Sequence, residues 1–149
     1  MIKGSAWFKA IGISLLILVL AGSYARAAEK VDVVLQDQTG GTATDHMAII
    51  STPDKVTAGQ VSFVIRNESK SLVHEMLLLR NSTSGDLPYD TTAQRIIERK
   101  TVKLVDTDDI QPGKSVTKTV RLSAGVYKMV CNQPGHYKSG MDTTFTVTP

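Results

Sequence analysis

Residues 126–148 read VYKMVCNQPGHYKSGMDTTFTVT, two short alternating runs separated by a loop. Tyr127, Met129 and Cys131 alternate with other residues in the first run, so their side chains are expected to face one side of a strand. Alternation of this kind, rich in β-branched and aromatic residues, is typical of β-strands. Proline and glycine favour turns, and Pro134, Gly135 and Gly140 supply them between the two runs. The stretch therefore predicts two strands joined by a turn-rich loop.

The same pattern recurs upstream of this stretch. The other alternating runs are VDVVLQ (31–36), QVSFVIRN (60–67), VHEMLLL (73–79) and KSVTKTVRL (114–122). Turn signals between the runs are Gly40-Gly41, Pro53-Asp54, Ala58-Gly59, Pro112-Gly113 and Ala124-Gly125. Short strands at this spacing predict an all-β fold, a Greek-key β-sandwich.

One stretch interrupts the strand pattern. Residues 91–103 (TTAQRIIERKTVK) suggest about two turns of helix, with Thr91 or Thr92 as N-cap. We interpret this stretch as a short helical excursion near residues 91–101, which crosses between two strands and does not form a second domain.

The first 27 residues resemble a secretory signal peptide. Lys3 and Lys9 give a positive start, residues 10–21 (AIGISLLILVLA) are apolar, and residues 25–27 (ARA) offer a small-x-small cleavage site. The apolar run is shorter than the roughly 20 residues of a membrane-spanning helix, although an uncleaved membrane anchor is the alternative. We expect cleavage to leave one domain, residues 28–149, exported to a bacterial periplasm.

The charge balance narrows the class of partner. The chain has 17 basic and 14 acidic side chains, and Lys3, Lys9 and Arg26 lie in the leader, which contains no acid. The mature domain is therefore nearly neutral, which argues against nucleic acid or an anionic membrane as partner. We expect a monomer without an integral membrane segment after cleavage.

The chemistry-bearing residues gather near the C-terminus. Cys131 is the only cysteine and has no partner for an internal disulfide, so its thiol is either buried and inert or chemically used. His136 and Met141 share its loop, and His74 lies in another predicted strand. Together these residues supply two imidazoles, a thiolate and a thioether, the donor set of a blue-copper site.

At these residues the chain resembles the cupredoxin family, and the Cys-x4-His-x4-Met loop is most similar to that of rusticyanin and auracyanin. Further matching segments are Ala58–Phe63, Asn67, Pro112-Gly113 and Ala124–Tyr127. The resemblance implies one type 1 copper ion with His74, Cys131 and His136 as equatorial ligands and Met141 as the weak axial ligand. It also implies an exported protein that shuttles single electrons between redox protein partners.

Two residues depart from the better-known family members. Glu75 follows the first histidine, where the family often has Asn or Ser, and Asn132 follows the cysteine, where Ser or Thr is common. Because groups around the ligands tune a metal site, both departures bear on the reduction potential more than on the choice of metal. We expect the Glu75 N–H to donate to the Cys131 sulfur, and the Glu75 side chain to point away from copper and brace the ligand loop, for example at Asn132.

Each ligand residue also has an ordinary structural interpretation. Cys131 alone would be a small buried apolar residue, His74 a core histidine, His136 an exposed loop residue and Met141 part of the core. His46-Met47 is interpreted as a loop-to-strand boundary, with contact to a copper ion as the alternative. Residues 106–109 (DTDD) lack the glycine and distal glutamate of a calcium loop and are interpreted as a solvated turn.

The donor set leaves three functions to compare. Four protein ligands leave no open position for substrate, so we do not expect an enzyme. Electron transfer is the leading hypothesis. The alternative is a periplasmic copper-binding protein for resistance, buffering or delivery. Zinc at the same cysteine and histidines is a weaker possibility, because a thioether is a poor zinc ligand.

Overall fold

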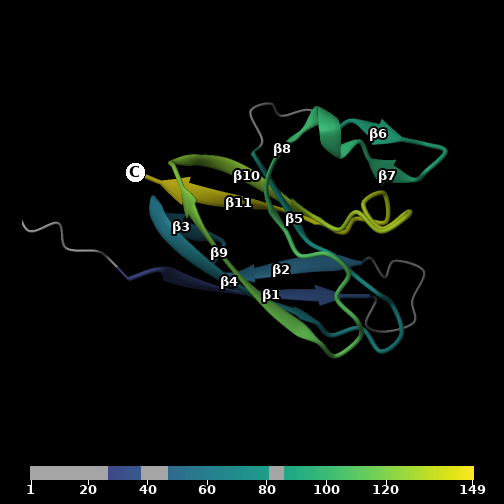
Figure 1. Cartoon of the computed structure of the whole chain (residues 1–149), viewed down its shortest axis with the longest axis horizontal. Coiled ribbons are helices and arrows are strands. Elements are labelled where there is room, and N and C mark those ends of the chain that lie inside the picture. The colour runs from purple at the N-terminus through teal and green to yellow at the C-terminus, as the bar shows by residue number, and fades with distance from the viewer. Residues whose placement is uncertain (1–26, 38–46, 81–85) are drawn as a thin grey trace, which may run out of the picture.

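The computed structural model describes residues 27–37, 47–80 and 86–149, which form a sandwich of two β-sheets (Figure 1). In the first sheet the order is β2 (Ala48–Thr52), β1 (Glu29–Gln36), β4 (Gly59–Asn67) and β9 (Ser115–Leu122). In the second it is β3 (Lys55–Thr57), β11 (Asp142–Thr148), β10 (Gly125–Val130), β5 (Leu77–Arg80) and β8 (Val102–Asp106). The all-β sandwich expected from the alternating runs is confirmed; residues 1–26 of the expected signal peptide lie outside the described residues.

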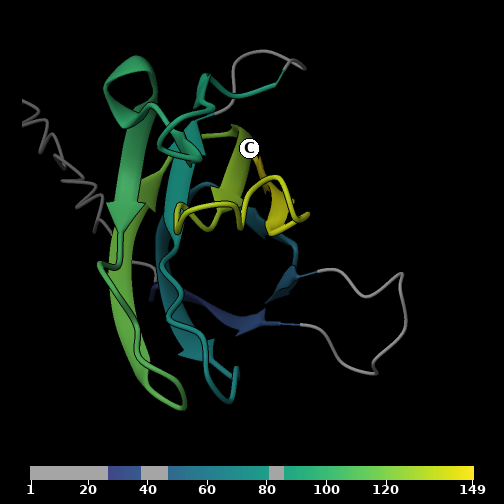
Figure 2. The same ribbon diagram turned by 90° about the vertical axis from the view of Figure 1, so that its right-hand side faces the viewer.

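The core lies between the two sheets, which enclose it when viewed from the end in Figure 2. Alternate residues of β1 and β4 are fully buried, in agreement with the period of two in their sequences. Phe63 of β4 meets Phe145 of β11 edge to face across the sandwich, with ring centroids 5.4 Å apart. Tyr127 and Met129 of β10 are buried in the same cluster, as their alternation predicted.

Strand β10 is the element that positions the ligand loop. It pairs antiparallel with β11 on one side and with β5 on the other, so that Met129 lies opposite both Thr143 and Leu78. Cys131 directly follows β10, and His74 lies three residues before β5. The register therefore brings these two residues, far apart in the sequence, to the same end of the second sheet.

The predicted helical excursion is present only as one 3-10 turn. Residues 89–96 form a small hairpin of β6 (Tyr89–Asp90) and β7 (Arg95–Ile96), followed by η1 (Glu98–Lys100). The expectation of two helical turns starting at Thr91 or Thr92 was wrong, because the Asp90 carboxylate accepts hydrogen bonds from the N–H groups of Thr92 and Ala93 and closes a tight turn there.

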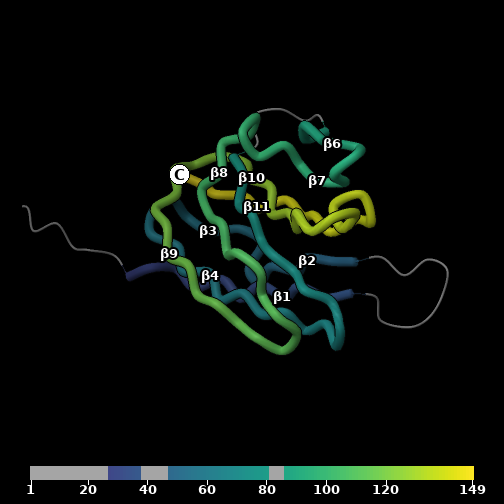
Figure 3. Tube along the Cα trace, turned by 45° about the vertical axis from the view of Figure 1, so that its right-hand side comes forward, coloured from purple at the N-terminus to yellow at the C-terminus, as the bar shows by residue number. Residues whose placement is uncertain are grey.

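Residues 89–100, called here the β6–η1 excursion, lie beside the loop that follows β10 (Figure 3). The Gly135 N–H of that loop donates to the Gln94 carbonyl at 2.9 Å. No helix in the described part of the chain is long and apolar enough to cross a bilayer.

Candidate metal centre

Backbone hydrogen bonds hold the predicted ligands in place. His74 forms an isolated antiparallel bridge with Ile110, in which each N–H donates to the other carbonyl, at 3.2 and 2.7 Å. In the ligand loop, the Cys131 N–H donates to the Met141 carbonyl at 3.0 Å, and the Met141 N–H donates to the His136 carbonyl at 3.1 Å. Backbone hydrogen bonds alone therefore close the loop of residues 131–141.

The side chain of Asn67 fixes the segment that leads to His74. Its amide nitrogen donates to the carbonyls of Leu72 and Ile110, both at 2.8 Å, and its oxygen accepts the N–H of Ser69 at 2.9 Å. Asn67 therefore connects the end of β4 to Ile110, the bridge partner of His74, and to Leu72, two residues before His74.

Three donor atoms converge at this end of the sandwich. The Nδ1 atoms of His74 and His136 are 3.1 Å apart, and the Cys131 Sγ lies 3.4 Å from the His136 Nδ1 and 3.8 Å from the His74 Nδ1. A triangle with these sides has its centre about 2 Å from each corner, close to the 2.0–2.3 Å of metal–imidazole and metal–thiolate bonds. The three side chains therefore fit one metal ion.

The predicted axial residue lies in the same place. Met141 is fully buried and packs in the same core cluster as Cys131. His74 and Cys131 are fully buried as well, whereas His136 is only partly buried. His136 is therefore the one of the three converging residues that reaches the surface of the molecule.

Burial sets the protonation of the metal-free site. Burial, and then the neighbouring His136, lower the pKa of His74 to about 4, and burial also lowers the pKa of His136. Burial raises the pKa of the Cys131 thiol to about 11, opposed by hydrogen bonds from the backbone N–H groups of Glu75 and Gln133. The Cys131 thiol must lose its proton to bind a metal as a thiolate, so metal binding here is coupled to proton release.

The other candidate residues fall outside this centre. His74, Cys131 and His136 form the only group of metal-binding side chains within the described ranges. Met47 packs partly buried against the core, and His46 lies outside the described residues. In the acidic segment of residues 106–109, the Asp106 carboxylate accepts the Asp108 N–H at 2.9 Å, so this segment forms a hydrogen-bonded turn.

Glu75 lies only partly where the sequence suggested. Its backbone N–H donates to the Cys131 Sγ at 3.5 Å, as expected. Its carboxylate is buried, with Oε1 3.9 Å from the Arg95 Nη1 and without a hydrogen-bond partner among the described residues. Burial raises the pKa of this carboxyl to about 7, opposed by the Arg95 guanidinium. The expected brace from Glu75 to Asn132 was wrong, because other groups use the Asn132 amide.

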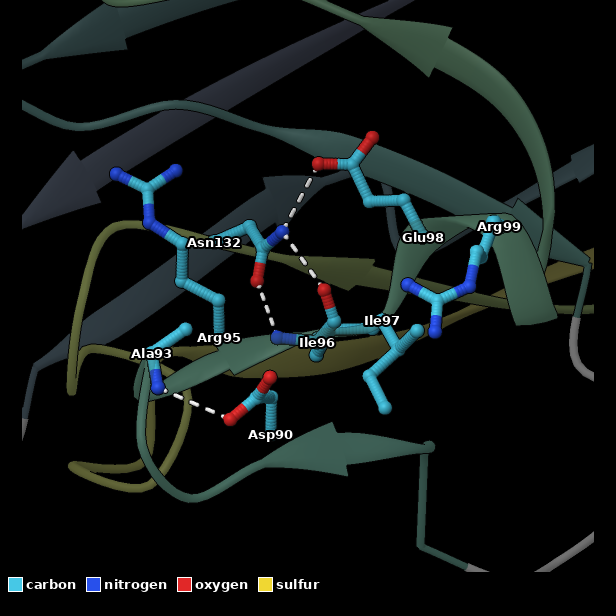
Figure 4. Close-up of a pocket in the computed structure, with 8 residues that line it drawn as sticks. All are labelled: Asp90, Ala93, Arg95, Ile96, Ile97, Glu98, Arg99 and Asn132. Carbon is cyan, nitrogen blue, oxygen red and sulfur yellow. Dashed lines mark hydrogen bonds between the residues drawn. The ribbon is translucent and has the colours of Figure 1, made fainter.

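Those groups belong to the β6–η1 excursion (Figure 4). The Asn132 Oδ1 accepts the Ile96 N–H at 2.6 Å, while Nδ2 donates to the Ile96 carbonyl at 3.2 Å and to the Glu98 Oε1 at 3.0 Å. Asn132 lines one side of an open hollow of about 330 Å³ together with Ile96, Ile97 and Arg99. Sequence reasoning missed Ile96 and Glu98 as neighbours of the metal centre, and only the polar residue after the cysteine hinted at them.

Comparison with known proteins adds a family and a set of structural relatives. Residues 36–148 match the family model of the sulfocyanin (SoxE) domain. Auracyanin B is 25% identical, with a TM-score of 0.59 over 82% of this chain and 90% of its own. Reduced rusticyanin is 20% identical, with a TM-score of 0.56 over 83% of this chain and 82% of its own. Reduced auracyanin from Roseiflexus castenholzii is 19% identical, with a TM-score of 0.56 over 83% of this chain and 100% of its own. No curated protein sequence matches.

Proposed function

The chain belongs to the sulfocyanin (SoxE) domain family, a family of cupredoxins, and on this premise we propose that it is a blue-copper protein that carries single electrons between redox protein partners. The observation that carries the proposal is the convergence of two imidazole nitrogens and one thiol sulfur within 3.1–3.8 Å. A His₂Cys set beside a buried methionine is the donor set that distinguishes blue copper from zinc.

In this proposal His74, Cys131 and His136 would hold one copper ion, and Met141 would supply a fourth, weaker donor. The bound ion supplies one-electron redox chemistry, and the chain supplies a rigid, largely water-free set of donors. Because backbone hydrogen bonds already hold His74, Cys131 and Met141, little rearrangement is needed when the charge of the site changes. The four protein donors leave no position for a substrate, which supports a carrier and not an enzyme.

We place this carrier outside the cytoplasm, with residues 1–27 as a cleaved signal peptide and residues 28–149 as a monomeric copper-binding domain in the periplasm. The leader sequence supports export. His136 is partly exposed, so its ring offers the shortest route between the buried donors and a partner protein. A nearly neutral mature domain suits contact with proteins better than contact with nucleic acid.

The rate of copper exchange separates electron transfer from copper handling. An electron carrier should give a reversible one-electron wave in voltammetry and should release copper slowly to a chelator in both oxidation states. A delivery or buffering protein should pass Cu(I) rapidly to the chelator, and that result would overturn the proposed function. The buried Cys131 and His74 favour slow release, because copper cannot leave without opening the loop.

Glu75→Gln is expected to raise the reduction potential modestly and to leave the blue colour unchanged. The exchange removes a negative charge next to Cys131 and leaves Arg95 without its counter-ion, and both changes disfavour Cu(II). The backbone N–H that donates to the Cys131 sulfur remains. Voltammetry well above pH 7, where the carboxyl is ionised, measures the shift.

Asp54→Asn is the matched control for Glu75→Gln. It removes the same charge from an exposed turn between β2 and β3, near Thr146 at the far end of β11. Its potential should stay within error of the wild type, since exposed charges are screened beyond roughly 10 Å. A lower potential in Glu75→Gln, or equal shifts in both variants, would refute a local role for the Glu75 charge.

A further inference from the structure

We propose that Asn132 is a positioning residue of the metal centre, an inference that rests on the proposed function. Its side chain ties the ligand loop to β7 and η1 and so holds the Gln133 N–H against the Cys131 sulfur. In this way the β6–η1 excursion, which contains no ligand, sets the charge on the sulfur and thereby the reduction potential.

The side-chain amide of Asn132 links the ligand loop to the β6–η1 excursion. Asn132 is 1% exposed, and all three of its hydrogen bonds go to the excursion. It accepts the Ile96 N–H and donates to the Ile96 carbonyl, as a neighbouring strand would. Since β6 and β7 form a two-stranded sheet, the Asn132 side chain covers the free edge of β7.

Asn132 lies next to the Cys131 sulfur through the backbone of the ligand loop. Asn132 directly follows Cys131, and the backbone N–H of Gln133, the next residue, lowers the pKa of the Cys131 thiol against the rise that burial causes. The other N–H at this sulfur comes from Glu75, in a separate segment. A rotation of the Asn132 backbone would therefore break the side-chain bonds and the Gln133 N–H contact together, but not the Glu75 contact.

The β6–η1 excursion is itself anchored to the second sheet through Glu98. The Glu98 carboxylate that accepts the Asn132 Nδ2 also accepts Lys103 Nζ at 2.6 Å, and Lys103 belongs to β8 of the second sheet. Further contacts join the loop to the excursion, since Arg95 Nη2 donates to the Gln133 Oε1 at 3.4 Å. The connection therefore runs from the sulfur through Asn132 to a strand of the sandwich.

Hydrogen bonds at the Cys131 sulfur control its electron density. Hydrogen bonds donated to a thiolate draw charge away from it and weaken its bond to Cu(II) more than its bond to Cu(I), which raises the potential; hydrogen bonding around this sulfur is a known control on blue-copper sites. Loss of the Gln133 N–H contact should therefore lower the potential. Removing a residue that orients a metal ligand also lowers the metal affinity, typically by about 10–100-fold.

The experiment uses Asn132→Leu, which keeps the size of the side chain and removes its hydrogen bonds. In the metal-free protein, amide hydrogen exchange at Ile96 and Gln133 should become at least about tenfold faster, because the local structure opens more readily. In the copper-loaded protein, the preference for Cu(I) should fall about tenfold, which for one electron is a drop of about 59 mV.

Three further variants, one of them a control, complete the test. Asn132→Asp loses both donated bonds and faces the Glu98 carboxylate, so it should behave like Asn132→Leu. Combining Asn132→Asp with Glu98→Gln exchanges donor and acceptor between the two side chains and should recover most of the exchange protection. Ser139→Ala is the control, because it removes an exposed side-chain bond to the Gly135 carbonyl in the same loop and should change neither readout.

The outcomes separate the positioning role from the proposed function. A wild-type protein without a copper–thiolate colour would refute the proposed function, and exchange in the metal-free variants would still decide whether Asn132 braces the loop. Faster exchange with an unchanged potential would mean that Asn132 has a structural role only and would overturn the positioning role. Unchanged exchange and potential in Asn132→Leu would overturn the inference as a whole.

Discussion

Cys131→Ser is expected to abolish the intense visible absorption and the one-electron activity of the copper-loaded protein, while the sandwich stays folded. Cys131 is the only cysteine, and its sulfur lies 3.4 and 3.8 Å from the two imidazole nitrogens. A serine hydroxyl is a hard, neutral donor that neither stabilises Cu(I) nor gives charge transfer from sulfur. Absorption spectra and voltammetry of the copper-loaded proteins measure both losses.

The fold itself should tolerate this exchange. The free energy of unfolding of the metal-free variant should differ from that of the metal-free wild type by no more than about 1–2 kcal/mol. The serine hydroxyl is similar in size to the thiol and meets the same N–H donors. Circular dichroism of the metal-free proteins checks that the strands are kept. A Cys131→Ser variant that remains intensely blue would contradict the thiolate assignment.

Met141→Leu is expected to keep the copper and the colour and to raise the reduction potential. A thioether donates weakly to Cu(II), and its removal favours Cu(I); the axial ligand is a recognised control on this potential. A tenfold change in the relative affinity for the two oxidation states corresponds to about 59 mV for one electron. The Met141 backbone bonds to Cys131 and His136 do not depend on the side chain, so the loop should stay closed.

Met129→Leu is the matched control for Met141→Leu. Met129 is a fully buried methionine of β10 in the same core cluster, and the exchange should cost less than about 1.5 kcal/mol. Voltammetry should find its potential equal to that of wild type. Equal potentials in Met141→Leu and wild type would show that Met141 is only a core residue.

The strands and the donor set were predictable because their signals are local. Val31, Val33 and Leu35 alternate in the sequence and are buried in β1, as a period of two requires for a strand with one face on a core. Cys131, His136 and Met141 share one loop, so their proximity needed no knowledge of the fold. Only His74 had to be placed by strand pairing, and the β5–β10 register brings it to Cys131.

The surroundings of the donors were not predictable, because they depend on contacts between distant segments. Residues 91–103 carry local helix signals, but the Ile96 N–H that a helix would use pairs with Asn132, 36 residues further along the chain. Glu75 looked like a strand residue that could brace Asn132, yet its carboxylate is buried near Arg95. A single sequence gives the order of such residues and not their pairing.

The visible absorption spectrum of the wild-type protein loaded with Cu(II) tests the central claim most directly. Charge transfer from the Cys131 thiolate to Cu(II) predicts an intense absorption band in the visible range. The band should saturate at one copper per chain and bleach on addition of a one-electron reductant. A copper-loaded protein with only the weak absorption of nitrogen and oxygen ligands would contradict ligation by Cys131 and, with it, the proposed electron carrier.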